Sequence, residues 1–260
     1  MGLLDDRVAI VTGIGSGMGR SIALRFAAEG ARLVLGARRE AYVKEVAAEA
    51  GALGTEPLVV PTDLASERDC ARIAEQAIEH FGGVDVFVQN GTFVGDFTDA
   101  MDADIGMWRR AMDVNLFGAL AIAKKVVPSM QARGGGRIVL VNSGAALSNP
   151  PKLGAYAASK AALASLARTM ANELGHSGVL VNSLTLGPVQ GENTTRAIAP
   201  AGASAEERER LVAEKGKALA LGHMPTPDEC ASAVLFLVSP LAAAITGQNL
   251  VVNGGQWVTV

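Results

Sequence analysis

The sequence is poor in the residues that stabilise small secreted domains or bind metal ions. Among its 260 residues there are two cysteines, Cys70 and Cys230, which lie far apart and form no CxxC pair. We therefore expect neither a disulfide framework nor a bound metal. Two isolated cysteines are instead typical of a protein from a reducing compartment, and we expect a cytoplasmic location.

Excess basic charge and long apolar runs are also missing. Lys and Arg number 23 against 26 Asp and Glu, a net charge of −3, so there is no broad basic surface for a phosphate backbone. No apolar run approaches the roughly 20 residues that span a bilayer, and the first residues carry no basic lead-in. We expect a protein that binds neither nucleic acid nor membrane.

What the chain has instead is 49% hydrophobic residues and 30 glycines, in a pattern of short β-branched runs alternating with helical stretches. This alternation predicts an α/β fold: one doubly wound Rossmann-type domain over residues 1–260, with a seven-stranded, mainly parallel sheet and helices on both faces. The expected strands are 7–12, 32–36, 58–61, 84–89, 137–141, 180–184 and 249–252. The expected helices are 16–29, 41–50, 67–81, 104–132, 155–174, 205–221 and 227–237.

A glycine-rich turn, Thr12-Gly13-Ile14-Gly15-Ser16-Gly17-Met18-Gly19, joins the first expected strand to the first helix. At this junction a helix N-terminus and backbone N–H groups can receive a phosphate, and glycine lets the backbone approach it closely. The turn therefore predicts a bound dinucleotide.

The glycine spacing TGxxxGxG resembles that of the short-chain dehydrogenase/reductase family, and further motifs in the same order extend the resemblance over nearly the whole chain. The family's acidic residue near adenine corresponds to Asp63. The family's Asn-Asn-Ala-Gly loop corresponds to Gln89-Asn90-Gly91-Thr92, in which Gln89 replaces the first Asn and Thr92 replaces the Gly. The cofactor-binding residues that the resemblance implies in this half are Gly13, Gly15, Ser16, Gly17, Met18, Gly19, Asp63, Leu64, Asn90 and Gly91.

The end of the second strand bears on the choice of nicotinamide cofactor. A carboxylate at this point would accept the ribose hydroxyls of NAD and repel a 2′-phosphate. The chain has Arg38 and Arg39 there, whose guanidinium groups suit a phosphate dianion. This favours NADP(H) and leaves NAD(H) open, since Ser16 stands where many NADP-using relatives carry a basic residue.

Tyr156 and Lys160 are four residues apart in an Ala-rich run that should be helical, so both side chains leave one face. An ammonium near a phenol favours the phenolate, as a proton donor and acceptor requires. Ser143 lies thirteen residues before Tyr156 and, we expect, just beyond the fifth strand, at the ligand-binding edge of the sheet.

In the family that these residues resemble, the serine orients the substrate oxygen, the tyrosine moves the proton, and the lysine holds the nicotinamide ribose and tunes the tyrosine. The resemblance assigns these roles to Ser143, Tyr156 and Lys160. It also implies that Asn115 holds a water molecule in a proton relay. Together they imply a secondary alcohol/ketone oxidoreductase that works by hydride transfer.

Beyond the sixth strand, the family's Pro-Gly segment beside the nicotinamide corresponds to Leu186-Gly187, so Gly187 and Val189 are implied as cofactor contacts. Leu186 replaces the usual proline. Gly191 replaces a common threonine, for which Thr194 or Thr195 could substitute.

The segment 190–221 is predicted to be a substrate lid, because a stretch of Gly, Asn, Thr, Pro and Ala precedes a charged helix. Small or apolar residues are expected to line the substrate pocket, with Lys152 as the one candidate for an inward charge, so we expect a small uncharged or moderately apolar alcohol or ketone. These lining residues are Phe93, Gly144, Ala145, Pro151 and Leu153. The Ala-rich helix and the C-terminal residues resemble the surfaces through which relatives form a homotetramer or homodimer.

Two alternatives stay open. One is a 3-oxoacyl-thioester reductase of the fatty-acid type, for which Arg109, Arg110, Lys124, Lys125 and Arg133 could attract an acidic carrier protein. The other is a catalytically silent NADP-binding regulator on the same fold. A serine hydrolase is not indicated, because the chain has no GxSxG motif.

Overall fold

The computed structural model describes residues 2–200 and 202–257 and contains one seven-stranded sheet. The strand order is β3-β2-β1-β4-β5-β6-β7, and all six neighbouring pairs are parallel. The predicted doubly wound α/β fold is therefore confirmed. The strands are β1 (Val8–Thr12), β2 (Arg32–Ala37), β3 (Leu58–Pro61), β4 (Val86–Gln89), β5 (Gly136–Ser143), β6 (Val179–Leu186) and β7 (Asn249–Val252).

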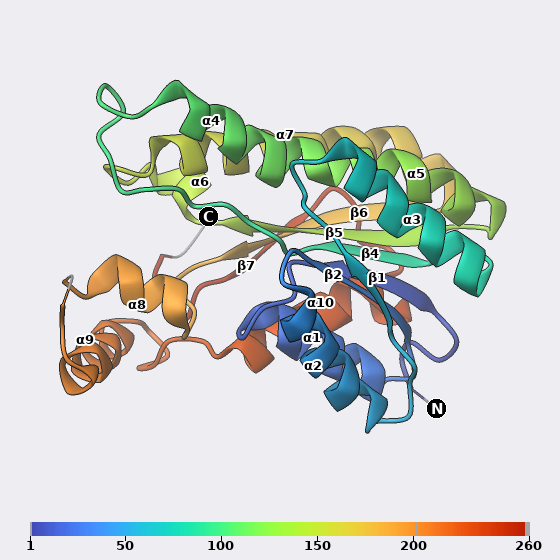
Figure 1. Ribbon diagram of the computed structural model, residues 1–260, viewed down its shortest axis with the longest axis horizontal. Helices are drawn as coiled ribbons and strands as arrows, with labels where there is room; N and C mark the ends of the chain where they lie inside the picture. The colour runs from blue at the N-terminus through green and yellow to red at the C-terminus, as the bar shows by residue number, and fades with distance from the viewer. Residues whose placement is uncertain (1, 201, 258–260) are drawn as a thin grey trace.

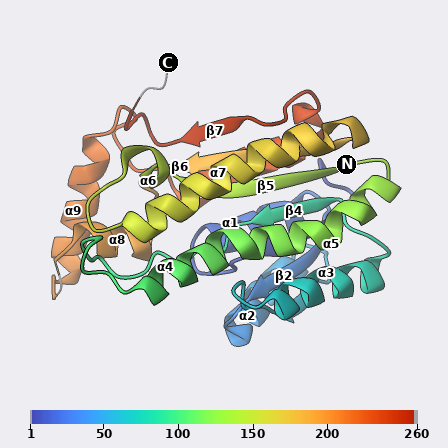
Figure 2. The ribbon, with the colours of Figure 1, turned by 90° about the horizontal axis from the view of Figure 1, so that it is seen from above.

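Helices cover both faces of the sheet (Figure 1). One face carries α1 (Met18–Ala28), α2 (Glu40–Gly51) and α10 (Pro227–Val238). The other carries α3 (Glu67–Phe81), α5 (Gly118–Ala132) and α7 (Gly154–Leu174), which Figure 2 shows lying across the sheet. Strand residues alternate between the two cores: Ile10 and Ile138 pack beneath α3, α5 and α7, whereas Val11 and Val139 face α1 and α10.

The helix expected over 104–132 is not continuous. It is divided into α4 (Ile105–Met112), a π-helical turn η1 (Asp113–Phe117) and α5. The wider turn is stabilised by the hydrogen bonds of the buried Asn115 side chain, described below, which no helical periodicity reveals. The first and ninth helices are also shorter than predicted: α1 begins at Met18, and α9 (Ala205–Lys217) ends four residues early.

At the carboxyl end of the sheet two predictions need correction, and one short helix is not predicted. Ser143 is the last residue of β5 rather than a loop residue, because the parallel ladder with β6 continues to the pair Ser143 and Leu186. After Gly144, the chain forms a short helix, α6 (Ala145–Ser148). The segment 190–221, for which a helix is expected only over 205–221, also contains α8 (Glu192–Ile198).

The strands end together because they are parallel, so the loops after β1, β4, β5 and β6 meet at one edge of the sheet. Helices α6, α8 and α9 lie at this end of the molecule, on the left in Figure 1. Helix α8 buries no residue, and α9 buries only Gly216, so this part is packed more loosely than the core. The remaining short helices are η2 (Gly175–Ser177) and η3 (Pro240–Ala242). Among the described residues, no helix has the length and apolar character that crossing a membrane requires.

Candidate functional site

Gly13 and Gly19 of the glycine-rich turn are required by packing within the chain. Gly13 has φ of +72°, and a Cβ there would lie 2.3 Å from the Cα and N atoms of Gly91. A Cβ on Gly19 would lie 2.3 Å from the Gly13 carbonyl oxygen. The Asn90 side chain donates a hydrogen bond to that same oxygen (2.9 Å). The loop after β4 and the loop after β1 are thus locked together backbone to backbone.

Gly15 and Gly17 are different, because nothing inside the chain explains their lack of a side chain. A Cβ at either position would meet no atom of the described residues within 4 Å, and neither has positive φ. Both lie immediately before the N-terminus of α1, which starts at Met18 and has no acidic residue in its first turn. An open cradle of backbone beneath free helix N–H groups fits a pyrophosphate. The exposed Ser16 lies between the two glycines.

The two arginines after β2 are exposed and close to this loop. The carbonyl of Gly36 accepts hydrogen bonds from the N–H groups of Gly13 and Ile14, which fixes the end of β2 beside the glycine turn. Within the described residues, Arg38 and Arg39 take part in no ion pair. Both guanidinium groups are therefore available to an anionic ligand.

Asp63 follows β3, and its carboxylate is already engaged. It accepts hydrogen bonds from Arg110 Nη2 (3.0 and 3.2 Å) and from the Ala65 N–H (3.1 Å). Burial raises the pKa of this carboxyl, but the Ala65 N–H, the Arg110 guanidinium and the charge of Arg38 together bring it below its ordinary value. Its neighbour Leu64 packs against Gly91, where a Cβ would lie 2.2 Å from Leu64 Cδ1. The contact of Asp63 with adenine stays a prediction.

The structure brings Ser143, Tyr156 and Lys160 together where β5 meets the first turns of α7. Ser143 Oγ accepts from the Ala145 N–H (3.2 Å) and is a side-chain hydrogen-bond partner of Tyr156. Lys160 is 2% exposed, its Nζ donates to the Val141 carbonyl (2.8 Å), and Nζ lies 5.9 Å from the centroid of the Tyr156 ring. The three side chains thus form one cluster at the carboxyl edge of the sheet.

Burial dominates the ionisation of this cluster. It lowers the pKa of the Lys160 ammonium to about 7. It raises the pKa of the Tyr156 phenol, and side-chain hydrogen bonding by Ser143 and Thr92 works in the opposite direction without cancelling it. In the absence of a ligand, the cluster therefore holds a protonated phenol above a lysine that titrates near neutrality.

Asn115 is fully buried in η1, and four hydrogen bonds use its whole side-chain amide. Nδ2 donates to the Phe93 carbonyl (2.9 Å) and to Ser159 Oγ (2.8 Å), while Oδ1 accepts from the Phe93 N–H (2.8 Å) and Thr92 Oγ1 (3.2 Å). Ser159 in turn donates to the Tyr156 carbonyl (2.8 Å). The side chain thus connects the loop after β4 to the turn of α7 that carries Tyr156. Its role in holding a water molecule stays a prediction.

Two departures from the family pattern, Gln89 at the end of β4 and Thr92 in the loop after it, have structural consequences. Gln89 is fully buried and accepts a hydrogen bond from the Thr12 hydroxyl, and its Nε2 donates to the carbonyls of Gly91 and Val114 (both 3.4 Å). The longer amide therefore still connects the strand end to the loop and to η1. Thr92 is exposed at the site; its hydroxyl donates to Asn115 Oδ1 (3.2 Å) and acts to lower the pKa of the Tyr156 phenol. The sequence identified Thr92 only as a departure.

The end of β6 and the residues that follow it lie beside the loop after β5 and the end of β7. The Leu186 carbonyl accepts from the Gly144 N–H (2.8 Å), and the Gly187 N–H donates to the Val252 carbonyl (2.9 Å). Val189 follows, half-buried, before α8. Within α8, the Thr195 hydroxyl donates to the Gly191 carbonyl (3.0 Å), which makes Thr194 the better candidate of the two for a ligand contact.

The predicted pocket residues lie around this cluster, and one neighbour was missed. Phe93, Ala145 and Leu153 are half-buried, whereas Pro151 and Lys152 are exposed. At Gly144 a Cβ would lie 2.2 Å from Cη2 of Trp257, near the C-terminus. No spacing or periodicity in the sequence points from Trp257 to Ser143.

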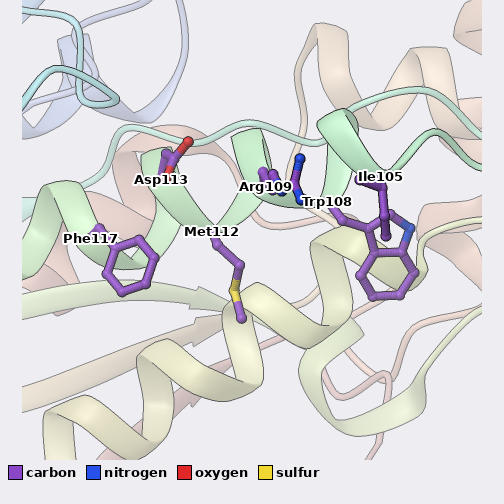
Figure 3. Close-up of a pocket in the computed structure, with 6 residues that line it drawn as sticks. All are labelled: Ile105, Trp108, Arg109, Met112, Asp113 and Phe117. Carbon is purple, nitrogen blue, oxygen red and sulfur yellow. The ribbon is translucent and has the colours of Figure 1, made fainter.

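A hollow of about 270 Å³ lies outside this cluster. Figure 3 shows its lining side chains extending from α4 and η1, and none of them is a predicted catalytic or cofactor-binding residue: Ile105, Trp108, Arg109, Met112, Asp113 and Phe117. Two of them, Ile105 and Phe117, are large apolar side chains that are 60% and 53% exposed. Among the described residues, no three His, Cys, Asp or Glu side chains are grouped as a metal site would require.

Comparisons with known proteins agree in pointing to one kind of enzyme. A family model described as enoyl-(acyl carrier protein) reductase matches residues 13–256. Dehydrogenase/reductase SDR family member 4 of Bos taurus is 35% identical over 97% of this chain and 88% of its own. A solved structure of 7α-hydroxysteroid dehydrogenase with NADH and 7-oxo glycochenodeoxycholic acid has a TM-score of 0.88 at 32% identity, covering 97% and 94% of the two chains. L-sorbose reductase from Gluconobacter frateurii, with NADPH and L-sorbose, has a TM-score of 0.93 at 28% identity, covering 100% and 99%.

Proposed function

Because the chain belongs to the short-chain dehydrogenase/reductase family and is an NAD(P)-dependent oxidoreductase acting on CH–OH groups, we propose that Ser143, Tyr156 and Lys160 carry out the proton transfer of its reaction. The observation that carries this proposal is the meeting of two hydroxyls, those of Ser143 and Tyr156, above the buried Lys160. The reaction interconverts a secondary alcohol and a ketone. Because the relatives are dehydrogenases and reductases, we set aside the alternative of a catalytically silent regulator.

The nicotinamide cofactor, when bound, supplies or accepts the hydride. Ser143 holds the substrate oxygen by a hydrogen bond, and Tyr156 donates its phenolic proton to that oxygen during reduction or accepts it during oxidation. Lys160 has three N–H donors, one of which is used by the Val141 carbonyl, so the others can hold ribose hydroxyls. In its charged form it stabilises the phenolate of Tyr156.

The fit of a dinucleotide rests on the open backbone at Gly15 and Gly17 and on the start of α1 above them. Gly13, Gly19, Asn90 and Gly91 hold that loop in place. Ser16, Met18, Asp63, Leu64, Gly187 and Val189 complete the set of proposed cofactor contacts.

We propose NADP(H) as the preferred cofactor. Arg38 and Arg39 are exposed beside the glycine loop, with no carboxylate partner among the described residues. The substitution Arg38→Asp should move the preference from NADPH toward NADH, because a carboxylate repels the 2′-phosphate and accepts ribose hydroxyls. The ratio of the two kcat/KM values measures this. An unchanged ratio would show that Arg38 does not read the phosphate.

The proposed substrate is a small uncharged or moderately apolar alcohol or ketone, because the residues around Ser143 are small or apolar. A carrier-protein thioester is less favoured, because three of the five cations that could attract an acidic carrier already have carboxylate partners: Arg110 with Asp63 (3.0 Å), Lys125 with Glu75 (2.8 Å) and Arg133 with Asp85 (3.1 Å). Ketones and acyl thioesters belong in the same activity panel. Segment 190–221, with the loosely packed α8 and α9, is the proposed lid.

We further propose a homotetramer, with a homodimer as the alternative. The exposed apolar side chains of the hollow in Figure 3 and the partly exposed edge strand β7 support contacts between copies. A cytoplasmic location is proposed from Cys70 and Cys230, which are both free and buried.

The decisive experiment is Tyr156→Phe. Removing the phenolic oxygen should reduce kcat by about a hundredfold to ten-thousandfold, the usual contribution of a positioned acid or base. NADPH binding, followed by fluorescence titration, should stay within a few-fold of wild type, which separates loss of chemistry from loss of folding. Turnover within tenfold of wild type would remove Tyr156 from the acid/base role.

A further inference from the structure

The residues after β7 turn back across the ends of β5 and β6. The Asn253 side chain fixes this turn: its Nδ2 donates to the Trp257 carbonyl (2.8 Å), and its Oδ1 accepts from the Gly255 N–H (2.8 Å). Asn253 also packs against Gly187, where a Cβ would lie 2.6 Å from Asn253 Cβ. The turn is therefore held at the carboxyl edge of the sheet, beside the residues after β6.

Trp257 is placed by this turn against the residue that follows Ser143. A Cβ on Gly144 would lie 2.2, 2.9 and 3.1 Å from three carbons of the indole six-membered ring. Gly144 does not have positive φ, so its backbone does not require glycine. The indole ring itself is the reason why a side chain has no room at position 144.

The ring is held by packing rather than by its polar atom. Indole Nε1 is buried and has no hydrogen-bond partner among the described residues, and the side chain as a whole is only partly buried. The exposed part of the ring is an apolar surface against which a ligand can pack. Leu147 on α6, four residues from Ser143, adds a further exposed apolar side chain close in the chain.

We propose that Trp257 is a specificity-determining residue, whose indole ring forms the wall of the substrate site beside Ser143 and favours ketones with a ring or another broad apolar face. This rests on the proposed function, since it places the substrate carbonyl at Ser143. A broad apolar ketone gains contact area with the ring, whereas a short-chain ketone reaches the Ser143 and Tyr156 hydroxyls without touching it.

The activity test compares a bicyclic ketone, decalone, with the short ketone butanone. Trp257→Ala should lower kcat/KM for decalone at least tenfold, mainly through KM, and change that for butanone less than threefold. Trp257→Phe should retain most of the preference. Leu53→Ala, which removes an exposed apolar side chain elsewhere, is the matched control and should alter neither ketone. Equal losses on both ketones with Trp257→Ala would overturn the proposal.

A double-mutant cycle tests the contact with Gly144 directly. Gly144→Ala should displace the indole ring and reduce the decalone preference about as much as Trp257→Ala does. In the Trp257→Ala background the same substitution should have less than a twofold further effect on that preference, because the ring it displaces is gone. Additive losses would show that Gly144 and Trp257 act independently and would contradict the proposal.

Fluorescence provides a readout that needs no turnover. The chain has two tryptophans, so Trp108→Phe leaves Trp257 as the only one. Decalone added to this variant with NADP⁺ should change its emission, and butanone should do so far less. No change at decalone concentrations that saturate turnover would overturn the proposal. If wild type reduces neither ketone, the proposed function fails for these substrates, and the emission of Trp257 alone decides whether its ring contacts decalone.

Discussion

At the scale of single residues, the ionisation of Tyr156 is set by opposed effects. Burial favours its neutral phenol, whereas the hydroxyls of Ser143 and Thr92 favour the phenolate. Thr92 stands where the resembled family pattern has glycine, so this chain adds a hydroxyl to the cluster. That hydroxyl also contacts Asn115, which ties it to the turn of α7 carrying Tyr156.

Replacing Thr92 should therefore change the pH dependence of catalysis. Thr92→Val removes one of the effects that lower the pKa of Tyr156, so the pKa rises and the kcat/KM profile for alcohol oxidation moves to higher pH. Thr92→Ser, which keeps the hydroxyl, should leave the profile in place. A profile that is the same in Thr92→Val as in wild type would show that the Thr92 hydroxyl does not act on the phenol.

The residue scale also shows where prediction from sequence ends. The spacing of Tyr156 and Lys160 predicts that their side chains lie together, because residues four apart in a helix share one face. Trp257 was missed because it reaches Gly144 only through a turn after the last strand. The sequence correctly predicts that Ser143 lies at the edge of the sheet, but the residue ends β5 instead of lying in the loop after it.

At the scale of elements, the glycine loop combines two requirements that its sequence does not separate. Gly13 serves packing, with positive φ and direct backbone contact, whereas Gly15 lies open. Gly13→Ala should lower the free energy of unfolding by more than about 2 kcal/mol and weaken nucleotide binding with it. Thermal denaturation and NADPH titration measure the two effects.

Gly15→Ala is the matched variant, and its effects should separate. Thermal stability should stay within about 0.5 kcal/mol of wild type, because the added methyl meets no atom of the described residues. The Kd for NADPH should rise at least tenfold, since the methyl enters the space assigned to the pyrophosphate. Unchanged NADPH affinity in a stable Gly15→Ala protein would argue against a phosphate at that loop.

Element boundaries were the least predictable part of the fold. The amphipathic pattern over 104–132 predicts one helix, and the chain does remain helical there, but the side-chain hydrogen bonds of Asn115 stabilise a π-turn within it. Those bonds join residues 22 and 44 positions apart. Local periodicity contains no information about partners so distant in the chain.

At the scale of the whole molecule, assembly provides a test that does not depend on activity. Phe117→Glu places a charge in the exposed apolar hollow on α4 and η1 (Figure 3). Wild type should elute with a mass about four times the 26.7 kDa of the chain, and the variant with a smaller mass and an unchanged circular dichroism spectrum. Leu53→Glu, beyond α2, is the control and should not change the mass. An unchanged mass for Phe117→Glu would place the subunit contacts elsewhere.

The strand order has a consequence for how the chain folds as it leaves the ribosome. After β4 joins β1, each later strand adds to the edge formed by the one before it: β5 on β4, β6 on β5 and β7 on β6. No late strand has to enter between two strands already paired. Synthesis from the N-terminus therefore delivers the strands in the order in which the sheet can accept them, and β1 to β4 are made before Ser143, Tyr156 and Lys160.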